Sequence, residues 1–123
     1  MTSCGFFDSG TSDLIGPRWQ LKSVLIDNST VAPPAASWIE FFPEHVFQAH
    51  TGCNGHGGEY STKSSSRIDI SVEISTYKLC PDLLEFERTM IDHLRSAGSF
   101  EQAGGELRLY RRATMIMVFS LAD

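Results

Sequence analysis

Thr51-Gly52-Cys53-Asn54, followed by Gly58-Glu59-Tyr60 and later by Cys80, is the most informative part of this chain. The two cysteines lie at turn signals on either side of a strand-like segment, and such a pair is typical of a disulfide that staples a small β-rich domain. Two buried thiols are the alternative, and export to an oxidising compartment would favour the disulfide. The pair lacks the C-x-x-C spacing of a catalytic dithiol, which argues against a redox function.

Alternation of apolar and polar residues dominates the sequence around this stretch and predicts β-strands. The clearest case is residues 67–75, where Ile68, Ile70, Val72 and Ile74 alternate with polar residues, so we expect these four side chains to face the core. Residues 27–34 are rich in turn formers and predict a loop. Further strands are expected at residues 18–26, 37–42, 46–50, 59–62 and 115–121, with two more on either side of Gly104-Gly105.

Between Cys80 and Gly98 the period of the apolar residues changes to three and four, which predicts the single convincing helix. Pro81 suits its first turn and Gly98 its carboxyl end. The order of elements predicts a β-dominated α+β domain: a strongly bent antiparallel sheet or small barrel with one helix packed against it. We expect one core that contains Trp19, Ile70, Leu83, Met90, Leu94 and Phe119.

The length of 123 residues, 41% of them hydrophobic, allows one domain and no more. We interpret residues 1–13 as a tail and residues 14–123 as the domain. A formal net charge of −5 argues against nucleic-acid partners and against a surface for anionic membranes. No apolar run approaches the roughly 20 residues of a spanning helix, so we expect contact with a membrane only if the chain carries a lipid anchor. We also expect a monomer.

The residues that could take part in catalysis or metal binding form only weak sequence motifs. His50, Cys53 and His56 are candidate metal ligands, but no second pair of ligands accompanies them, so we interpret the histidines as surface turn residues and expect neither a metal nor a cofactor. No G-x-S-x-G elbow or phosphate-binding loop is present. Glu85 and Glu87 are too close in sequence to share a helix face, so we assign both to solvated surface and expect no catalytic residue.

Several short motifs occur together in a recognisable order, and in this order and spacing the chain resembles the META domain family of HslJ-like bacterial lipoproteins. The resemblance extends over residues 14–123. The pattern also includes the glutamate of the helix, Glu87, and a closing pair of leucines, Leu107 and Leu109. The matching residues are Trp19, Leu21, Gly52, Cys53, Asn54, Gly58, Tyr60, Thr76 and Cys80.

The amino terminus fits this resemblance. Met1-Thr2-Ser3-Cys4 is similar to the end of a bacterial lipobox, in which the cysteine is lipidated after cleavage, and the Gly- and Ser-rich residues behind it would form a tether. An incidental thiol in a frayed tail is the alternative for Cys4. Together these features imply a location in the periplasm or on the outer membrane.

The resemblance implies a non-catalytic cell-envelope protein, tethered to the membrane, that binds an unidentified envelope partner or supports envelope integrity under stress. A carrier of a small apolar ligand is the alternative, because a bent sheet can enclose a pocket. An enzyme is the least expected class. The aromatic residues that would line such a carrier, or else fill its core, are Trp19, Trp38, Phe41, Phe42 and Phe47.

Overall fold

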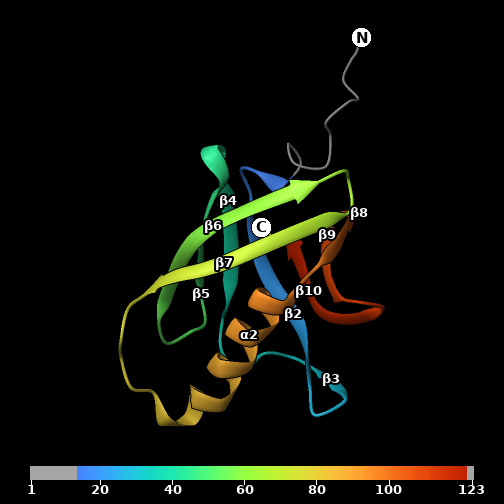
Figure 1. Ribbon diagram of the computed structural model, residues 1–123. Coiled ribbons are helices and arrows are strands. Elements are labelled where there is room, and N and C mark those ends of the chain that lie inside the picture. The colour runs from blue at the N-terminus through green and yellow to red at the C-terminus, as the bar shows by residue number, and fades with distance from the viewer. Residues whose placement is uncertain (1–13, 122–123) are drawn as a thin grey trace.

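Antiparallel strands form one continuous sheet in the computed structural model, which describes residues 14–121 (Figure 1). The strand order is β10-β9-β8-β7-β6-β5-β4-β2-β3, and β10 also pairs with β2, so that eight strands close into a barrel and β3 extends it as a short flap. The strands are β2 Arg18–Ile26, β3 Ser29–Val31, β4 Trp38–Phe42, β5 Val46–His50, β6 Gly55–Lys63, β7 Arg67–Ser75, β8 Ser99–Ala103, β9 Glu106–Arg111 and β10 Thr114–Leu121.

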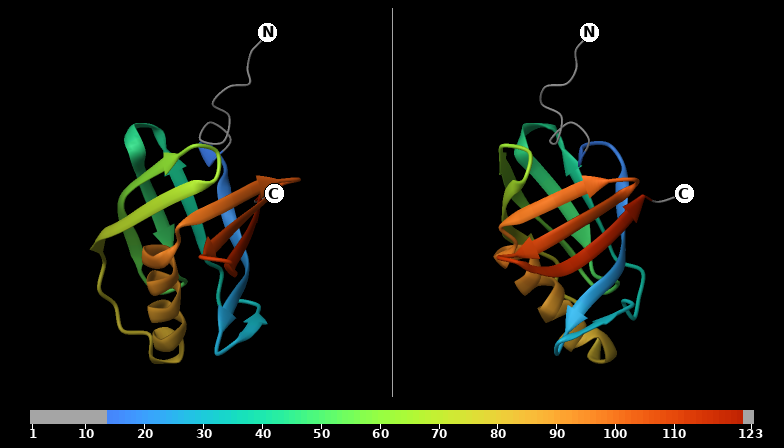
Figure 2. Two further views of the ribbon diagram at one scale, coloured as in Figure 1. Left: turned by 45° about the vertical axis from the view of Figure 1, so that its right-hand side comes forward. Right: turned by 90° about the vertical axis from the view of Figure 1, so that its right-hand side faces the viewer.

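One helix, α2 Leu84–Ser96, follows a 3₁₀ turn at Pro81–Leu83. It lies at one end of the barrel beside the β2–β3 hairpin, as both views of Figure 2 show. Phe86, Met90 and Leu94 recur on its buried face, and the acidic residues of its first turn complement the positive end of the helix dipole. Within the described part of the chain, the predicted α+β architecture with a single helix packed against the sheet is therefore confirmed. None of the helices within residues 14–121 combines the length and the apolarity that crossing a bilayer requires.

Apolar and polar residues alternate along the strands, and the apolar side chains fill the interior of the barrel. Trp19, Phe41 and Phe47 are among the largest fully buried side chains and belong to one core cluster, whereas Trp38 and Phe42 are only partly buried. The expected core residues Trp19, Ile70, Met90, Leu94 and Phe119 all belong to this cluster. Leu83 does not: it is half-buried, because it lies in the 3₁₀ turn before the regular helix begins.

Ile74 departs from the expected alternation of β7 and is 73% exposed. The β6–β7 ladder pairs Gly57 with Ile74 but Gly58 with Val72, so Glu73 is an extra residue that forms a β-bulge. A bulge reverses the facing of the residues behind it, and this turns Ile74 away from the core. The prediction that all four aliphatic residues of this strand face inward was therefore wrong at the last one.

The loop expected at residues 27–34 contains a short strand. Asp27 and Asn28 adopt positive φ angles of 52° and 66°, which makes a tight turn and returns the chain as β3 against β2. The barrel is held least firmly between β7 and β8, where Arg67 and Ser99 form the one ladder pair. Two backbone hydrogen bonds, Ile68 N to Gly98 O and Phe100 N to Ser66 O, extend that contact.

Candidate functional site

A disulfide joins Cys53, in the turn between β5 and β6, to Cys80, immediately before the 3₁₀ turn, as the sequence predicted. The Cα atoms lie 6.1 Å apart, within the range that a disulfide allows. Gly52 makes the turn with φ of 94°, and a Cβ atom there would lie 2.6 Å from the Cβ of Ala35. The bond therefore fixes the chain that enters α2 to the end of the β5–β6 hairpin.

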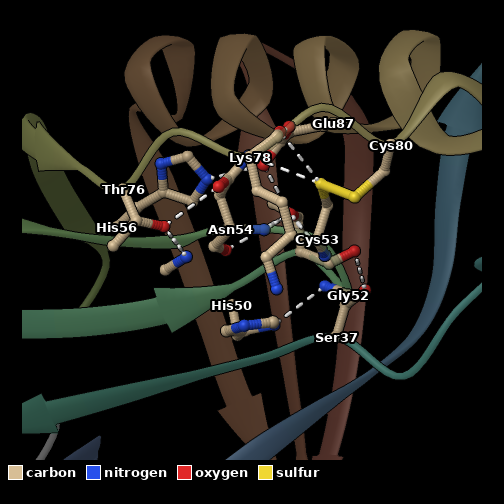
Figure 3. The surroundings of a disulfide bond; sticks show 12 residues. Ser37, His50, Gly52, Cys53, Asn54, His56, Thr76, Lys78, Cys80 and Glu87 are labelled. Carbon is tan, nitrogen blue, oxygen red and sulfur yellow. Dashed lines mark hydrogen bonds and ion pairs between the residues drawn. A yellow bond between two sulfur atoms is a disulfide. The ribbon is translucent and has the colours of Figure 1, made fainter.

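Asn54, beside the disulfide, is 4% exposed and uses both ends of its amide (Figure 3). Its Nδ2 donates to Glu87 Oε1 at 3.1 Å and to the carbonyl of Lys78 at 3.0 Å. Its Oδ1 accepts from Thr76 Oγ1 at 3.0 Å. One buried side chain thus connects the β5–β6 turn, the segment that follows β7, and α2. We call Thr51, Asn54, His56, Ser75, Thr76 and Glu87 the Asn54 network.

Glu87 is the acceptor at the centre of the Asn54 network, and its side chain is only 14% exposed. Besides Asn54, it accepts from Thr51 Oγ1 at 2.6 Å and from His56 Nε2 at 3.0 Å. Burial acts to raise the pKa of Glu87, but the hydrogen bonds from Thr51, His56 and Asn54 stabilise the carboxylate and together hold its pKa below the ordinary value. The folded protein therefore favours ionised Glu87.

His56 links this carboxylate to a serine. A carboxylate accepts only, so the ring nitrogen Nε2 carries a proton toward Glu87, and in the neutral ring Nδ1 then accepts from the hydroxyl of Ser75, 2.7 Å away. The His56 side chain is 6% exposed, whereas Ser75 is exposed. A carboxylate, imidazole and hydroxyl in series is an arrangement that can accept a proton from the serine.

Two expectations from the sequence were wrong. His56 was interpreted as a surface turn residue and Glu87 as solvated helix surface, but both side chains are largely buried in one polar cluster. The two residues are 31 positions apart and meet only because the helix packs against the barrel end. Glu87 was one of the residues on which the family resemblance rested, and this match was the feature of the sequence that could have indicated its role.

The candidate metal ligands do not converge. Cys53 is oxidised in the disulfide, His56 is bound to Glu87 and Ser75, and His50 Nδ1 accepts from the amide of Gly52 at 3.0 Å. Among residues 14–121, no group of three His, Cys, Asp or Glu side chains is arranged to hold a metal ion. Cys4 lies outside the described residues.

The remaining motif residues have contacts that specify the fold. Trp19 Nε1 donates to the carbonyl of Leu14 at 3.1 Å, and Tyr60 packs edge-on against Phe41, with ring centroids 4.8 Å apart. Gly58 lies so close to β7 that an added Cβ would overlap the carbonyl oxygen of Ser71. These residues therefore shape the barrel, and the Asn54 network attaches the helix to it.

The end of β7 and the segment that leads to the 3₁₀ turn present three apolar side chains to solvent, and we call residues 74–79 the exposed segment. Ile74, Tyr77 and Leu79 are 73%, 95% and 68% exposed. Its backbone is nevertheless tied down: Thr76 N donates to Gly55 O at 2.9 Å, and Lys78 O accepts from Asn54. The Asn54 network and the disulfide thus hold in place a segment whose apolar side chains point outward.

Comparisons with known proteins identify the family from the sequence and, separately, find the same fold in solved structures. A family model described as the META domain matches residues 12–123. A protein from Burkholderia xenovorans, solved by NMR, superposes with a TM-score of 0.70 at 16% identity, covering 100% of this chain and 93% of that one. A second NMR structure gives a TM-score of 0.65 at 21% identity, covering 91% and 94%. A search among curated proteins finds no match.

Proposed function

The chain belongs to the META domain family, and we propose that it is a non-catalytic binding module of the bacterial cell envelope whose contact surface is the exposed segment. One observation carries this proposal: hydrogen bonds hold the backbone of the exposed segment in place, while the apolar side chains of Ile74, Tyr77 and Leu79 are exposed to solvent. Neighbouring apolar side chains that remain in water mark interaction sites more often than scattered single ones do.

Anchoring supports this role because a segment already held in position loses little conformational entropy on binding. Thr76 and Lys78 hydrogen-bond to the β5–β6 turn and Asn54, and Cys80 is bonded to Cys53. The three exposed apolar residues are interleaved with these anchored positions. The surface is therefore formed before the partner arrives.

The compartment we propose is the periplasm or the outer membrane, where a disulfide persists. Lipidation of Cys4 would tether the domain there. The partner we propose is an envelope protein with an apolar recess, because a chain with a net charge of −5 is repelled by an anionic bilayer surface. A role in envelope integrity under stress would then be exercised through that partner.

Site-specific photo-crosslinking in the bacterial envelope tests this proposal. We expect a photoreactive phenylalanine derivative at Tyr77 to give a discrete cross-linked protein band. The same group at Met115, an exposed apolar residue of β10, is the control and should give none. Leu79→Ser should weaken the band and leave the melting temperature unchanged. Equal cross-linking from positions 77 and 115 would contradict the proposal.

A second candidate is acyl transfer, favoured by the series of Ser75, His56 and Glu87. Here Ser75 Oγ would attack the carbonyl carbon of an ester or amide while His56 takes its proton, and the bond to the leaving alcohol or amine would then break as His56 returns that proton to it. Labelling with a fluorophosphonate probe separates the two candidates, because only an activated serine reacts. Ser71 is an exposed serine of the same strand and serves as the internal control. We expect neither serine to be labelled; modification at Ser75 alone would establish the enzyme.

A further inference from the structure

A cleft of about 350 Å³ opens between α2 and the β2–β3 hairpin, away from the exposed segment. Glu85, Thr89 and His93 line one wall, and they follow one another at four-residue steps along a single helix face. Leu25 and Asp27, at the end of β2 and in the turn behind it, line the other. Its volume lies in the range of small-molecule sites.

His93 is a buried polar residue of this cleft with an unused ring atom. It is 7% exposed, and its Nε2 lies 2.8 Å from the carbonyl oxygen of Leu25, which can only accept, so Nε2 carries the proton. Nδ1 is buried and has no hydrogen-bond partner among the described residues. Buried polar atoms are rarely left unpaired, and because Nδ1 has almost no exposed surface, a ligand with a donor group pairs with it only if the imidazole turns slightly toward the cleft.

Charges of both signs line the same cleft without neutralising each other. Asp27 and Glu85 contribute carboxylates from opposite walls, and Arg111, at the end of β9, contributes a guanidinium. Within residues 14–121, none of these three forms an ion pair. Arg111 donates only a long hydrogen bond, 3.5 Å, to Ser96 Oγ. A ligand with both charges would find a partner for each.

We propose that this cleft binds a small zwitterion, of amino-acid or dipeptide size. Its ammonium group is held by Glu85 and Asp27 and donates to His93 Nδ1 once the imidazole turns toward the cleft, and its carboxylate pairs with Arg111. A short apolar body lies against Leu25. This site is separate from the exposed segment, so the two proposals stand or fall independently.

NMR titration of the ¹⁵N-labelled protein with the dipeptide Ala-Ala tests the proposal. We expect saturable shifts confined to residues 25–28, 85–93 and 111, together with a change in the ¹⁵N resonance of His93 Nδ1, which a purely structural histidine would not show. Acetylating the dipeptide amine, or amidating its carboxylate, should weaken binding about tenfold, the effect of losing roughly 1.4 kcal/mol.

Matched variants test which charged residue of the cleft pairs with which end of the dipeptide. Glu85→Gln should weaken binding of Ala-Ala but have no further effect on the acetylated dipeptide, and Arg111→Gln should behave likewise toward the amidated one. Asp92→Asn and Arg112→Gln change neighbouring exposed charges outside the cleft and should leave binding unaltered. Absence of saturable shifts at millimolar dipeptide, or equal binding of the capped and free forms, would overturn the proposal.

Discussion

At Glu87, burial is the largest single effect and raises the pKa, but hydrogen bonds from three donors converge on the carboxylate and together with the nearby His56 they lower the pKa below its ordinary value. The unfolded chain has an ordinary glutamate pKa of about 4.3. Because the folded value is lower, the contribution of Glu87 to stability is complete above the unfolded pKa and is lost as the pH falls through the folded pKa.

Glu87→Gln should therefore reduce the acid sensitivity of folding. At neutral pH we expect the variant to be less stable by about 1–3 kcal/mol, since hydrogen bonds to a charged acceptor are replaced by weaker ones. Between pH 6 and 3 its stability should fall less steeply than that of the wild type, as measured by urea unfolding. Glu59→Gln, at an exposed position, is the control and should keep the wild-type slope. Parallel curves for Glu87→Gln would contradict this account.

The two tryptophans differ in burial, so truncating each should have a different effect. Trp19 is 1% exposed in the core, and we expect Trp19→Ala to lower the free energy of unfolding by about 3–5 kcal/mol through cavity formation. Trp38 lies partly exposed under the guanidinium of Arg18, 3.8 Å from its ring centroid, and its truncation should have a smaller effect. Equal denaturation midpoints for wild type and Trp19→Ala would show the first strand to be misassigned.

At the scale of elements, two glycines of β6 provide a matched pair. A Cβ at Gly58 would overlap the carbonyl oxygen of Ser71 across the bulge, whereas a Cβ at Gly55 would meet nothing closer than 3.8 Å. Gly58→Ala should force β6 from β7 and destabilise the protein by about 1–3 kcal/mol or more. Gly55→Ala should be close to neutral by thermal unfolding. Similar melting temperatures for both would argue against close strand contact at the bulge.

Local patterns predicted most elements because period and turn chemistry are local properties. The bounds of β2, β5 and β7 agree with the sequence analysis, and the helix lies where the period changes. β3 was missed because Ser29-Thr30-Val31 has too little apolar alternation, and Ile74 was misplaced because a bulge cannot be recognised from one strand. A bulge is a property of a pair of strands.

The polar cluster was the least predictable feature, and the reason lies at the scale of the whole molecule. Thr51 precedes Ser75 and Glu87 by 24 and 36 positions, and these residues meet only after the barrel has closed and the helix has packed across its end. The cysteine pair was predictable because both cysteines lie at turn signals on either side of a strand-like segment, and such a position is typical of a disulfide in a small domain. The sequence indicated the disulfide but not the Asn54 network, and the two lie at the same place in the fold.

The disulfide should also determine the stability of the molecule as a whole. It joins residues 27 positions apart, and loop-closure entropy gives it a contribution of roughly 3.5 kcal/mol. Reduction, or the double variant Cys53→Ser with Cys80→Ser, should lower the free energy of unfolding by about that amount and release the segment that enters α2. Reductant added to the double variant is the control and should change nothing further.

Intact-mass measurement after alkylation checks the pairing itself. In material produced oxidatively, Cys53 and Cys80 should be protected until reductant is added, and Cys4 should be the one thiol outside the bond. Two alkylated core thiols in such material, or a bond from Cys4 to either of them, would overturn the assignment. Reduced protein from a cytosolic preparation would not, because that compartment keeps even well-placed thiols reduced. An unchanged unfolding free energy after verified reduction would instead show that the Asn54 network alone holds the helix to the barrel.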